Sequence, residues 1–455
     1  MHDVLIVGGG IAGLSAAWEL SRRGHTPMVL ERAARPGGVI RTELVDGFVI
    51  DAGPDSLLAQ KPAALDLCRE LGLSERLFPT LAPRTAFILR DGQLVPLPEG
   101  SVLGIPTKVS PFITTRLFSW RGKARMALEL AVRPRRDQED ESIGHFMRRR
   151  FGQEAVTYLA EPLLAGIHGG DVNRLSIGAA FPRLVDAERT YGSVLRGLSA
   201  LNAGSPSSST GAFMSLPGGI EELVTTLVDR LPPGSVQTKA EVVDVRGQGP
   251  FAVTLASGEV IDTHAVIVAA PAWAAAPMLA SIDTTLAQRI AEIPYASSAT
   301  VVMAFRREQV RHPLAGSGYV VPRPERHVLM AASWVSSKWP QRAPAGYVLL
   351  RAFVGGAYDL SILDQSDDAI TGAALDELSR QLGITGEPAL VRVYRWPRAN
   401  AQHEIGHLQR MTDIDRRLAS YPGLFVTGSG YRGTGIPDCV ADGRATATRA
   451  SDFLG

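Results

Sequence analysis

The N-terminal segment constrains the fold more than any other part of the chain. Residues 4–7 (Val-Leu-Ile-Val) are a short apolar run typical of a parallel strand buried on both faces. Residues 8–13 (Gly-Gly-Gly-Ile-Ala-Gly) follow at once, residues 14–23 predict a helix, and residues 28–30 predict a strand that ends at Glu31. Strand, glycine turn, helix and strand in this order predict a βαβ unit.

Each glycine of this turn has a physical role. Gly8 allows a tight turn, Gly10 lets the backbone approach a pyrophosphate, and Gly13 lets helix and strand pack closely. The helix N-terminus adds free N–H groups and a partial positive charge. Glu31 is placed to accept hydrogen bonds from ribose hydroxyls. Glycines alone are common in turns, but this order of elements predicts a dinucleotide site, for either FAD or NAD.

The following segment favours FAD over NAD as the dinucleotide. After Glu31 come Gly37-Gly38 and Arg41, and then Gly53-Pro-Asp-Ser56. This spacing resembles the extended fingerprint of the amine-oxidase-type flavoproteins, whose glycines and basic residue lie along the FAD diphosphate and flavin. A plain glycine-rich turn is the alternative for these residues taken alone.

The composition is that of a globular enzyme. Hydrophobic residues make up 45% and charged residues 20% of the chain, which excludes a disordered protein, a fibre and a coiled coil. Lys plus Arg is 47 against 46 Asp plus Glu, so no overall field attracts nucleic acid. The two cysteines, Cys68 and Cys439, cannot form a disulfide framework, and such usage indicates a reducing compartment, the cytoplasm.

One uncharged stretch, residues 265–282, has about the length of a membrane span. Pro271 and Pro277 interrupt it, so the sequence predicts a buried strand that ends at Pro271. A strand-like run already begins at Asp3. We therefore expect neither a membrane span nor a signal peptide.

Two later segments are expected to complete the nucleotide-binding part. Residues 242–245, 251–255 and 266–268 predict a strand–turn–strand module typical of FAD domains. Residues 424–427 predict a further strand, followed by a glycine-rich loop and an Ala-rich helix over 438–453. The start of that helix offers a second set of backbone N–H groups.

Two large blocks separate these segments. Residues near 105–205 are helix-prone, and their charge runs favour solvated helix faces, with weak contact to a membrane surface as the alternative. Residues 202–210 form a polar, Ser-rich link. Strand-rich stretches and a predicted helix over 367–382 favour a substrate domain built on a sheet.

The predicted fold class is α/β for the nucleotide-binding part and α+β for the chain as a whole, with a monoamine-oxidase-like arrangement of domains. The chain is expected to comprise a discontinuous Rossmann-type FAD domain (1–85, 211–275 and 415–455), a mixed-sheet substrate domain (86–104 and 276–414) and a helical, membrane-type insertion (105–210).

Residues 403–407 (His-Glu-Ile-Gly-His) match the H-E-x-x-H pattern of zinc proteases. Gly406 would lie inside the required helix, Pro397 lies just upstream, and no third ligand is evident. We therefore expect a pair of loop or domain-boundary histidines and no metal. Cys439 is expected to be a small buried packing residue rather than a reactive thiol.

Runs over nearly the whole chain resemble one family. The sequence is similar to the bacterial porphyrinogen oxidases of haem biosynthesis, in the fold group of monoamine oxidase. Two strings, Gly-Ile-Pro-Thr-Lys and Gly-Ile-Pro-Asp-Cys, resemble most the Gram-positive type, the soluble coproporphyrinogen III oxidases. The matching runs include Gly8–Leu14, Gly53–Ser56, Leu103–Lys108, Glu161–Ile167, Gly170-Asp171, Lys338-Trp-Pro, Leu350–Gly356, Arg395-Trp396, Gly406-His407 and Gly433–Cys439.

The resemblance implies an FAD enzyme that oxidises a reduced tetrapyrrole, removing six electrons in three steps. Each step passes a hydride to flavin N5, and O2 reoxidises the flavin and yields hydrogen peroxide. The cofactor carries this chemistry, so no catalytic protein residue is assigned. The implied FAD contacts are Gly8, Gly9, Gly10, Ile11, Ala12, Gly13, Glu31, Arg32, Gly37, Gly38, Arg41, Gly53, Pro54, Asp55, Ser56, Val242, Trp396, Gly435, Ile436 and Pro437.

The resemblance also implies four substrate contacts. Lys61 matches a position at the pocket mouth, where a propionate needs a cation, and an ordinary surface lysine is the alternative. Phe353 matches an aromatic residue that packs on the macrocycle, and plain core is the alternative. Gly169 falls in a loop that approaches the substrate in relatives, and Tyr319 is a further pocket candidate.

The sequence also departs from the family pattern. His168 and Gly169 stand where relatives often have an aromatic residue and alanine, and residues 401–403 (Ala-Gln-His) replace a more common Pro-Gln-Tyr. Ala52 replaces a basic residue. These departures concern the propionate contacts rather than the flavin site.

Several functions stay open on the sequence alone. Coproporphyrinogen III is the expected substrate, and protoporphyrinogen IX, with two propionates rather than four, is the alternative. An amine oxidase or carotenoid desaturase on the same fold, and a non-catalytic porphyrin carrier, are more distant. The expected partners are the tetrapyrrole, O2 and a ferrochelatase that takes the product, with no nucleic acid.

Overall fold

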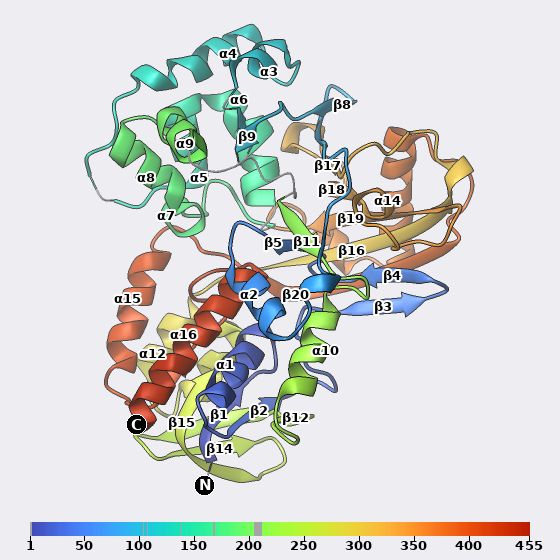
Figure 1. The fold of residues 1–455 in the computed structure, drawn as a ribbon. Helices are drawn as coiled ribbons and strands as arrows, with labels where there is room; N and C mark the ends of the chain where they lie inside the picture. The colour runs from blue at the N-terminus through green and yellow to red at the C-terminus, as the bar shows by residue number, and fades with distance from the viewer. Residues whose placement is uncertain (1, 103, 107, 138, 167–168, 204–211) are drawn as a thin grey trace.

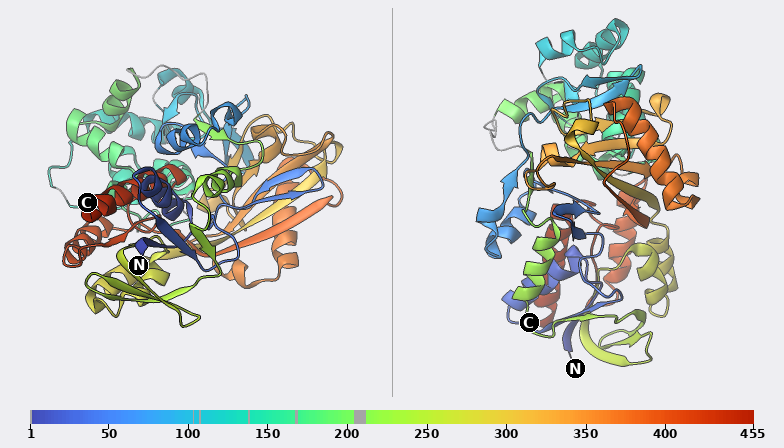
Figure 2. Two further views of the ribbon diagram at one scale, coloured as in Figure 1. Left: turned by 60° about the horizontal axis from the view of Figure 1, so that its bottom comes forward. Right: turned by 90° about the vertical axis from the view of Figure 1, so that its right-hand side faces the viewer.

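A computed structural model describes residues 2–102, 104–106, 108–137, 139–166, 169–203 and 212–455. His168 and most of the Ser-rich link 202–210 lie outside these residues. Figure 1 shows a sheet with helices on both faces at the bottom, a second sheet at the right and a block of helices at the top. The two ends of the chain both lie in the bottom region (Figures 1 and 2).

The bottom region is built on a seven-stranded sheet, in which β21 pairs with β15 outside the main order β12-β2-β1-β15-β14-β13. Its strands are β1 (His2–Val7), β2 (Pro27–Glu31), β12 (Val236–Thr238), β13 (Val242–Gly247), β14 (Phe251–Leu255), β15 (Val260–Val268) and β21 (Leu424–Val426). The pairs among β12, β2, β1, β15 and β21 are parallel, and β13, β14 and β15 form an antiparallel meander. Segments from the start, middle and end of the chain thus share one sheet.

Helices cover both faces of this sheet, which explains the unbroken apolar run at residues 4–7. Val4 and Ile6 lie in a core with α1 (Ile11–Arg22), α2 (Ala63–Glu70), α10 (Glu221–Arg230) and α16 (Ile436–Leu454). Leu5 and Val7 lie in a second core with α11 (Ala272–Leu279), α12 (Thr284–Ala291) and α15 (His407–Leu418).

A second seven-stranded sheet has the order β20-β16-β19-β18-β17-β7-β8, and every pair is antiparallel except β17 with β7. Its strands are β7 (Ala86–Arg90), β8 (Gln93–Pro96), β16 (Tyr295–Arg306), β17 (Gly318–Val320), β18 (Leu329–Trp334), β19 (Tyr347–Gly355) and β20 (Leu390–Ala401). α14 (Asp367–Leu382) covers one face. The hairpin of β3 (Thr42–Val45) and β4 (Phe48–Asp51) covers part of the opposite face. The hairpin and the second sheet therefore share a core.

The helical block contains the expected helix-rich segment. Its elements are α3 (Val109–Thr114), α4 (Trp120–Ala127), α5 (Ile143–Phe151), α6 (Gln153–Ala155), a π-helical stretch over Val156–Ala165, α7 (Ile177–Ala180), α8 (Pro182–Tyr191) and α9 (Val194–Ala203). The other short strands and the short helix α13 are β5 (Leu57–Leu58), β6 (Phe78–Pro79), β9 (Ser101–Val102), β10 (Ile105–Pro106), β11 (Phe213–Ser215) and α13 (Val335–Lys338). Single 3-10 turns lie at Ser74–Arg76, Leu128–Ala131, Arg307–Gln309, Arg323–Glu325 and Ser361–Asp364.

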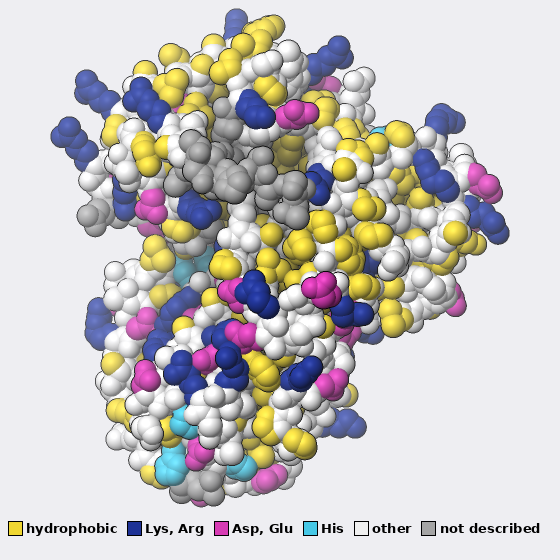
Figure 3. All heavy atoms as spheres, in the orientation of Figure 1, with side chains coloured by type: hydrophobic (Ala, Val, Ile, Leu, Met, Phe, Trp, Pro, Cys, Tyr) yellow, Lys and Arg dark blue, Asp and Glu magenta, His cyan; other side chains and the backbone are white. Residues whose placement is uncertain are grey.

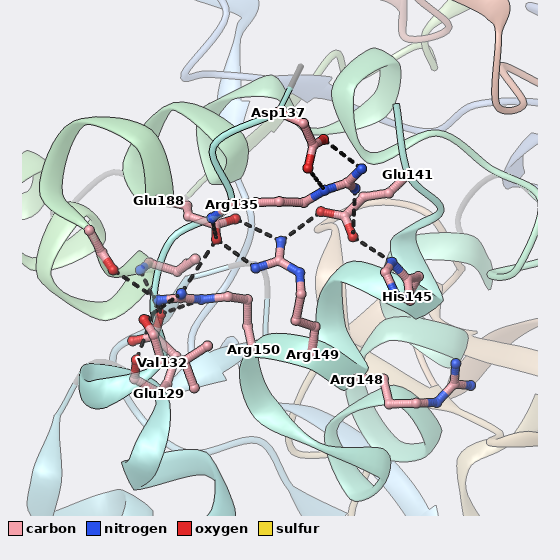
Figure 4. Close-up of polar contacts among 12 residues, drawn as sticks. Glu129, Val132, Arg135, Asp137, Glu141, His145, Arg148, Arg149, Arg150 and Glu188 are labelled. Carbon is pink, nitrogen blue, oxygen red and sulfur yellow. Dashed lines mark hydrogen bonds and ion pairs between the residues drawn. The ribbon is translucent and has the colours of Figure 1, made fainter. Parts of the chain in front are cut away.

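A network of ion pairs joins the elements of this block (Figure 4). We call it the helical-block network and define it as Glu129, Arg135, Glu141, Arg149, Arg150 and Glu188. Arg150 and Glu129 are fully buried and form a hydrogen-bonded ion pair, with Arg150 Nε 2.8 Å from Glu129 Oε1. Arg149 lies between two carboxylates, at 2.6 Å from Glu188 Oε1 and 2.6 Å from Glu141 Oε1.

The boundaries of the main predicted elements hold with small shifts. The helix expected over 367–382 is α14 itself, and the C-terminal helix extends to both sides of the expected 438–453 as α16. The uncharged stretch 265–282 forms the end of β15 and α11. No helix in the described part of the chain is long and apolar enough to cross a membrane.

Candidate cofactor and substrate site

The glycine turn after β1 leaves an open cradle in front of α1. Gly8 has a φ of +109°, and a Cβ on Gly13 would lie 2.1 Å from Gly8 O, so both positions require glycine. A Cβ on Gly10 would meet nothing within 4 Å. The first turn of α1 has no side-chain cap, so its backbone N–H groups face this open space.

Glu31 closes the next part of the cradle, at the carboxyl end of β2. Its Oε2 accepts a hydrogen bond from Gly9 N–H (2.7 Å), and its Oε1 accepts one from Ala33 N–H (2.7 Å). Each carboxylate oxygen keeps a second lone pair for a ribose hydroxyl. Ala240 N–H donates to Glu31 O (2.9 Å), which brings the start of β13, and with it Val242, to the same end of the sheet.

The second glycine pair lies against the first turn. Gly37 N–H donates to Gly9 O (2.7 Å), and a Cβ on Gly38 would lie 3.5 Å from Gly10 Cα. The predicted basic residues beside them stack on aromatic rings. Arg32 lies 5.2 Å from the ring of Trp273, and Arg41 lies 5.7 Å from the ring of Tyr394.

A second helix starts near this cradle. α16 begins directly after Gly435 with Pro437 in its first turn, a position that proline favours. It packs closely on α1, because a Cβ on Gly443 would lie 2.3 Å from Ala12 O. Cys439 is buried in this first turn, and burial raises its pKa to about 12, so the expectation of a packing residue is confirmed.

Lys61, predicted at the mouth of the substrate pocket, contacts the start of α16. Its Nζ lies 2.7 Å from both carboxylate oxygens of Asp438. The Lys61 side chain is half exposed. The structure therefore gives Lys61 a protein counter-ion on the helix that borders the cradle.

The two histidines of the H-E-x-x-H string support the glycine-rich loop 428–435 that precedes α16. His403 Nε2 lies 3.1 Å from Ser429 O, and His407 Nε2 lies 2.7 Å from Tyr431 O. Their rings stack with centroids 3.9 Å apart. Burial lowers the pKa of His407 to about 3 and also lowers that of His403, so each neutral ring donates one N–H to a loop carbonyl. His403 lies in a loop and His407 opens α15, as a boundary pair rather than two ligands on one helix.

Charged residues are buried where the hairpin β3–β4 meets the second sheet. We call Asp51, Asp55, Lys338, Arg342 and Arg351 the junction cluster. Lys338 Nζ lies 2.7 Å from Asp55 Oδ2. Burial alone would raise the pKa of Asp55, but Lys338 and Arg351 outweigh it and hold that pKa well below its usual range. Asp55 is therefore a fixed anion in the segment 53–56 that was predicted to contact FAD.

Two side chains from the second sheet bind the backbone at the start of that segment. Arg351 Nη2 donates to Ala52 O (3.2 Å) and to Gly53 O. Trp396 Nε1 also donates to Ala52 O (3.2 Å). Gly53 packs against the loop that contains Val39, because a Cβ there would lie 1.9 Å from Val39 O.

The predicted substrate contacts separate into two groups. Phe353 is half-buried on the face of β19 that carries Arg351, whose guanidinium lies 4.7 Å from its ring. Gly169 reaches the end of the same strand, since its carbonyl accepts a hydrogen bond from Ala357 N–H (2.8 Å). Tyr319 instead lies in the core beneath α14, on the opposite face, and burial raises its pKa. The structure does not bring Tyr319 to the site, because the register of β17 turns its side chain away.

These residues fit a flavin dinucleotide. The open space at Gly10 lies before an uncapped helix start, Glu31 offers carboxylate oxygens for a ribose, and α16 supplies a second helix start nearby. Sequence reasoning missed Arg351 in β19 and Lys338 and Trp339 at the end of α13, which fix the segment 53–56. The available signal was a charged residue, Arg351, inside an otherwise apolar strand.

Comparisons with known proteins agree with this architecture. Residues 11–451 match the family described as flavin containing amine oxidoreductase. The coproporphyrinogen III oxidase of Bacillus subtilis is 37% identical, with 99% of this chain and 98% of that protein aligned. The chloroplastic/mitochondrial protoporphyrinogen oxidase 2 of Arabidopsis thaliana is 26% identical over 99% of this chain and 94% of that protein.

Solved structures show the same relationship. A candidate protoporphyrinogen oxidase from Exiguobacterium sp. 255-15 superposes with a TM-score of 0.88 at 32% identity, over 99% of this chain and 98% of that one. A putrescine oxidase variant shares the fold with a TM-score of 0.71 at 17% identity, over 98% of each chain. The chain therefore belongs to the flavin containing amine oxidoreductases, in the group that includes the bacterial coproporphyrinogen III oxidases.

Proposed function

We propose that this protein is an FAD-dependent oxidase that converts coproporphyrinogen III to coproporphyrin III, with O2 as the electron acceptor. The observation that carries the proposal is the full-length similarity to coproporphyrinogen III oxidases of three bacteria, at 30–37% identity. The plant protoporphyrinogen oxidases are less similar, at 26–29%. The ranking favours coproporphyrinogen III over protoporphyrinogen IX.

The cofactor site proposed here joins the glycine turn to the start of α16. FAD bound there would supply an acceptor for electron pairs from the substrate, with O2 as the final acceptor. The residues proposed to hold it are Gly8–Gly13, Glu31, Arg32, Gly37, Gly38, Arg41, Gly53–Ser56, Val242, Trp396 and Gly435–Pro437. Their contributions are backbone N–H groups for phosphates and one carboxylate for a ribose.

The substrate is proposed to lie between this cofactor and the second sheet. Phe353 presents an aromatic face there, suited to packing on a macrocycle, and Gly169 limits the bulk of the neighbouring loop. Lys61 is proposed to meet a propionate in exchange for part of its contact with Asp438. No protein nucleophile is needed, because the protein's task is to orient the reacting carbon and to exclude water.

The test is an aerobic assay of purified yellow protein with coproporphyrinogen III and protoporphyrinogen IX side by side. We expect porphyrin fluorescence and hydrogen peroxide to appear together, with the higher kcat/KM for coproporphyrinogen III. A higher kcat/KM for protoporphyrinogen IX would show that the alternative substrate is the correct one. Porphyrin binding without any change of the flavin spectrum under anaerobic conditions would indicate a carrier, and turnover of an amine or a carotenoid instead would indicate the more distant enzymes.

We further propose that the helical block touches an anionic membrane surface. Its outer helices expose five large apolar side chains, with the exposed cations Lys108, Arg116 and Arg121 among them and no exposed acid between residues 109 and 128. Figure 3 shows hydrophobic side chains and Lys or Arg together over this block. The five are Val109, Ile113, Trp120, Leu128 and Leu130.

Such a surface would keep a sparingly soluble porphyrin near a membrane for hand-over to a ferrochelatase. At low salt the protein should sediment with anionic phosphatidylglycerol vesicles, and it should stay in the supernatant with neutral phosphatidylcholine vesicles. Trp120→Ser should weaken that binding. Equal recovery of the protein with and without anionic vesicles would exclude the contact.

A further inference from the structure

Arg351 occupies an unusual place for a charged residue. It lies in the middle of β19, with Leu350 and Ala352 on either side turned into the core under α14. Only 6% of Arg351 is exposed. A guanidinium buried to this degree destabilises the fold unless it is paired, so its position requires a specific partner.

That partner is the backbone rather than a carboxylate. Arg351 forms no ion pair within 4.0 Å with any described acidic residue, whereas Asp55, the nearby acid, binds Lys338 and Trp339. The hydrogen bonds of Arg351 go instead to Ala52 O and Gly53 O. Its Nε has no partner among the described residues. The cation is thus used to hold two consecutive carbonyl groups.

Holding these carbonyls fixes the direction of a free donor. In a trans peptide the C=O and the following N–H point in opposite directions, so a bond from Ala52 O to the second sheet turns Gly53 N–H away from that sheet. No described residue accepts a hydrogen bond from Gly53 N–H. Trp396 supports the same arrangement through its own bond to Ala52 O. The free donor therefore points away from the second sheet, in a segment whose Gly53 Cα packs against Val39 O, next to Gly38 of the cradle.

The same guanidinium also contacts the proposed substrate wall. Phe353 lies two residues further along β19, on the same face, and its ring is 4.7 Å from the Arg351 guanidinium. One rigid, planar side chain therefore touches the backbone at the start of the cofactor segment and the aromatic ring proposed to face the macrocycle. Both carbonyl bonds come from Nη2. Lysine is one bond shorter and lacks the planar guanidinium, so its ammonium cannot reach both carbonyls while a planar group lies against the Phe353 ring.

The geometry points to Arg351 as a positioning residue that sets the relative placement of cofactor and substrate. It acts by orienting the Ala52–Gly53 peptide toward the cofactor while holding the Phe353 ring. This inference rests on the proposed function and adds to it the residue that couples the two halves of the site.

The experiment compares Arg351→Lys with Arg342→Lys. Arg342 is the matched control: it is also buried in the junction cluster, and its side chain pairs with Asp51 (3.0 Å) and Ser215 (2.8 Å). It reaches the segment 53–56 only through the Ser215 hydroxyl, which donates to Asp55 O, and in the described part of the chain it forms no hydrogen bond to Ala52 O or Gly53 O. Each variant is purified, and the dissociation constant for FAD, the visible flavin spectrum, the melting temperature and the steady-state constants are measured.

Both variants should lower the melting temperature. Only Arg351→Lys should weaken FAD binding, by about tenfold, and shift the flavin spectrum. It should also lower kcat by about ten- to a hundredfold, with a smaller change in KM, because small misplacements of reacting groups have effects of this size. Equal FAD affinity, spectrum and kcat in the two variants would overturn the inference and leave Arg351 a structural residue. If the wild-type protein binds no flavin, the proposed function itself fails, which is a different outcome.

A second variant keeps the test decisive if Arg351→Lys does not fold. Trp396→Phe removes the other donor to Ala52 O and keeps an aromatic ring. It should give the same pattern with smaller effects, a few-fold in FAD affinity and kcat. Unchanged flavin spectrum and kcat in a folded Trp396→Phe protein would contradict the role assigned to the Ala52 carbonyl.

Discussion

Two regions of this molecule bury charged residues in different ways. In the helical-block network each guanidinium meets at least one carboxylate, and Arg150 with Glu129 forms a pair that is fully shielded from solvent. In the junction cluster Lys338 and Arg342 also pair with carboxylates, but Arg351 hydrogen-bonds backbone carbonyls instead.

This difference indicates a separate role for each cluster. In the helical-block network charge-assisted pairs with carboxylates join one element to another, and the carbonyl contacts of Arg150 to Val132 O and Gly192 O add to them. A cation bound to carbonyls fixes the orientation of particular peptides, which matters only where those peptides meet something else. The buried charges of the helical-block network are therefore assigned to stability, and among the junction residues Arg351 is assigned to the cofactor site.

Gly10→Val should produce the largest effect on the cofactor side of this comparison. The position has open space and a φ of −71°, so the valine fits the fold while its side chain fills the cradle. The purified protein should be folded and colourless. Circular dichroism and flavin absorbance measure the two properties, and Gly372→Val, at an exposed site with equally open space, should stay yellow. A yellow Gly10→Val protein would show that the phosphates lie elsewhere.

Arg150→Met should produce the largest effect on the stability side. It leaves Glu129 buried without a cation, which costs about 3–5 kcal/mol of unfolding free energy. Urea unfolding gives the change, and the flavin content of the folded fraction should be normal. Arg148→Met, an exposed site on the same helix α5, should change the unfolding free energy by less than about 0.5 kcal/mol. Loss of flavin from folded Arg150→Met would show that the helical-block network also affects the cofactor site.

Acid should act through His407. Its pKa is lowered to about 3 in the folded protein, whereas the unfolded chain binds a proton near pH 6.5. The stability that depends on this neutral ring is therefore complete above pH 6.5 and is lost as the pH falls toward 3. At pH 5 the loss amounts to about 2 kcal/mol, which His407→Gln should remove from the pH dependence of urea unfolding. An unchanged slope in that variant, relative to one with the exposed His327 replaced by Gln, would contradict the prediction.

Lys61→Ala should have the smallest effect, because its pair with Asp438 is half exposed. If Lys61 also meets a propionate, KM for coproporphyrinogen III should rise a few-fold with little change in kcat. Asp438→Asn is the discriminating variant, since it removes the counter-ion and keeps the lysine. The same change in KM in both variants would show that Lys61 only anchors α16.

The sequence predicted the βαβ unit and its glycine turn, but not the contacts that cross from one sheet to the other. Gly8 to Glu31 is a local pattern: Gly9 contacts Glu31 and Gly13 packs on Gly8 within the same βαβ unit, so the spacing specifies these contacts. Arg351 depends on the register between β19 and a hairpin about 300 residues earlier in the chain, and no local pattern carries that contact. Tyr319 was misplaced for the same reason, because the face of β17 that it occupies is set by pairing with β18 and by cover from α14.

The packing of α16 on α1 has a consequence for synthesis. The first strands and helix of the cofactor cradle emerge early from the ribosome, whereas β21 and α16, which complete the same sheet and its helical cover, emerge last. A nascent chain therefore holds an unfinished apolar face for most of its translation, a situation that invites chaperones and aggregation. The cradle proposed to hold the flavin is complete only once α16 has docked on α1.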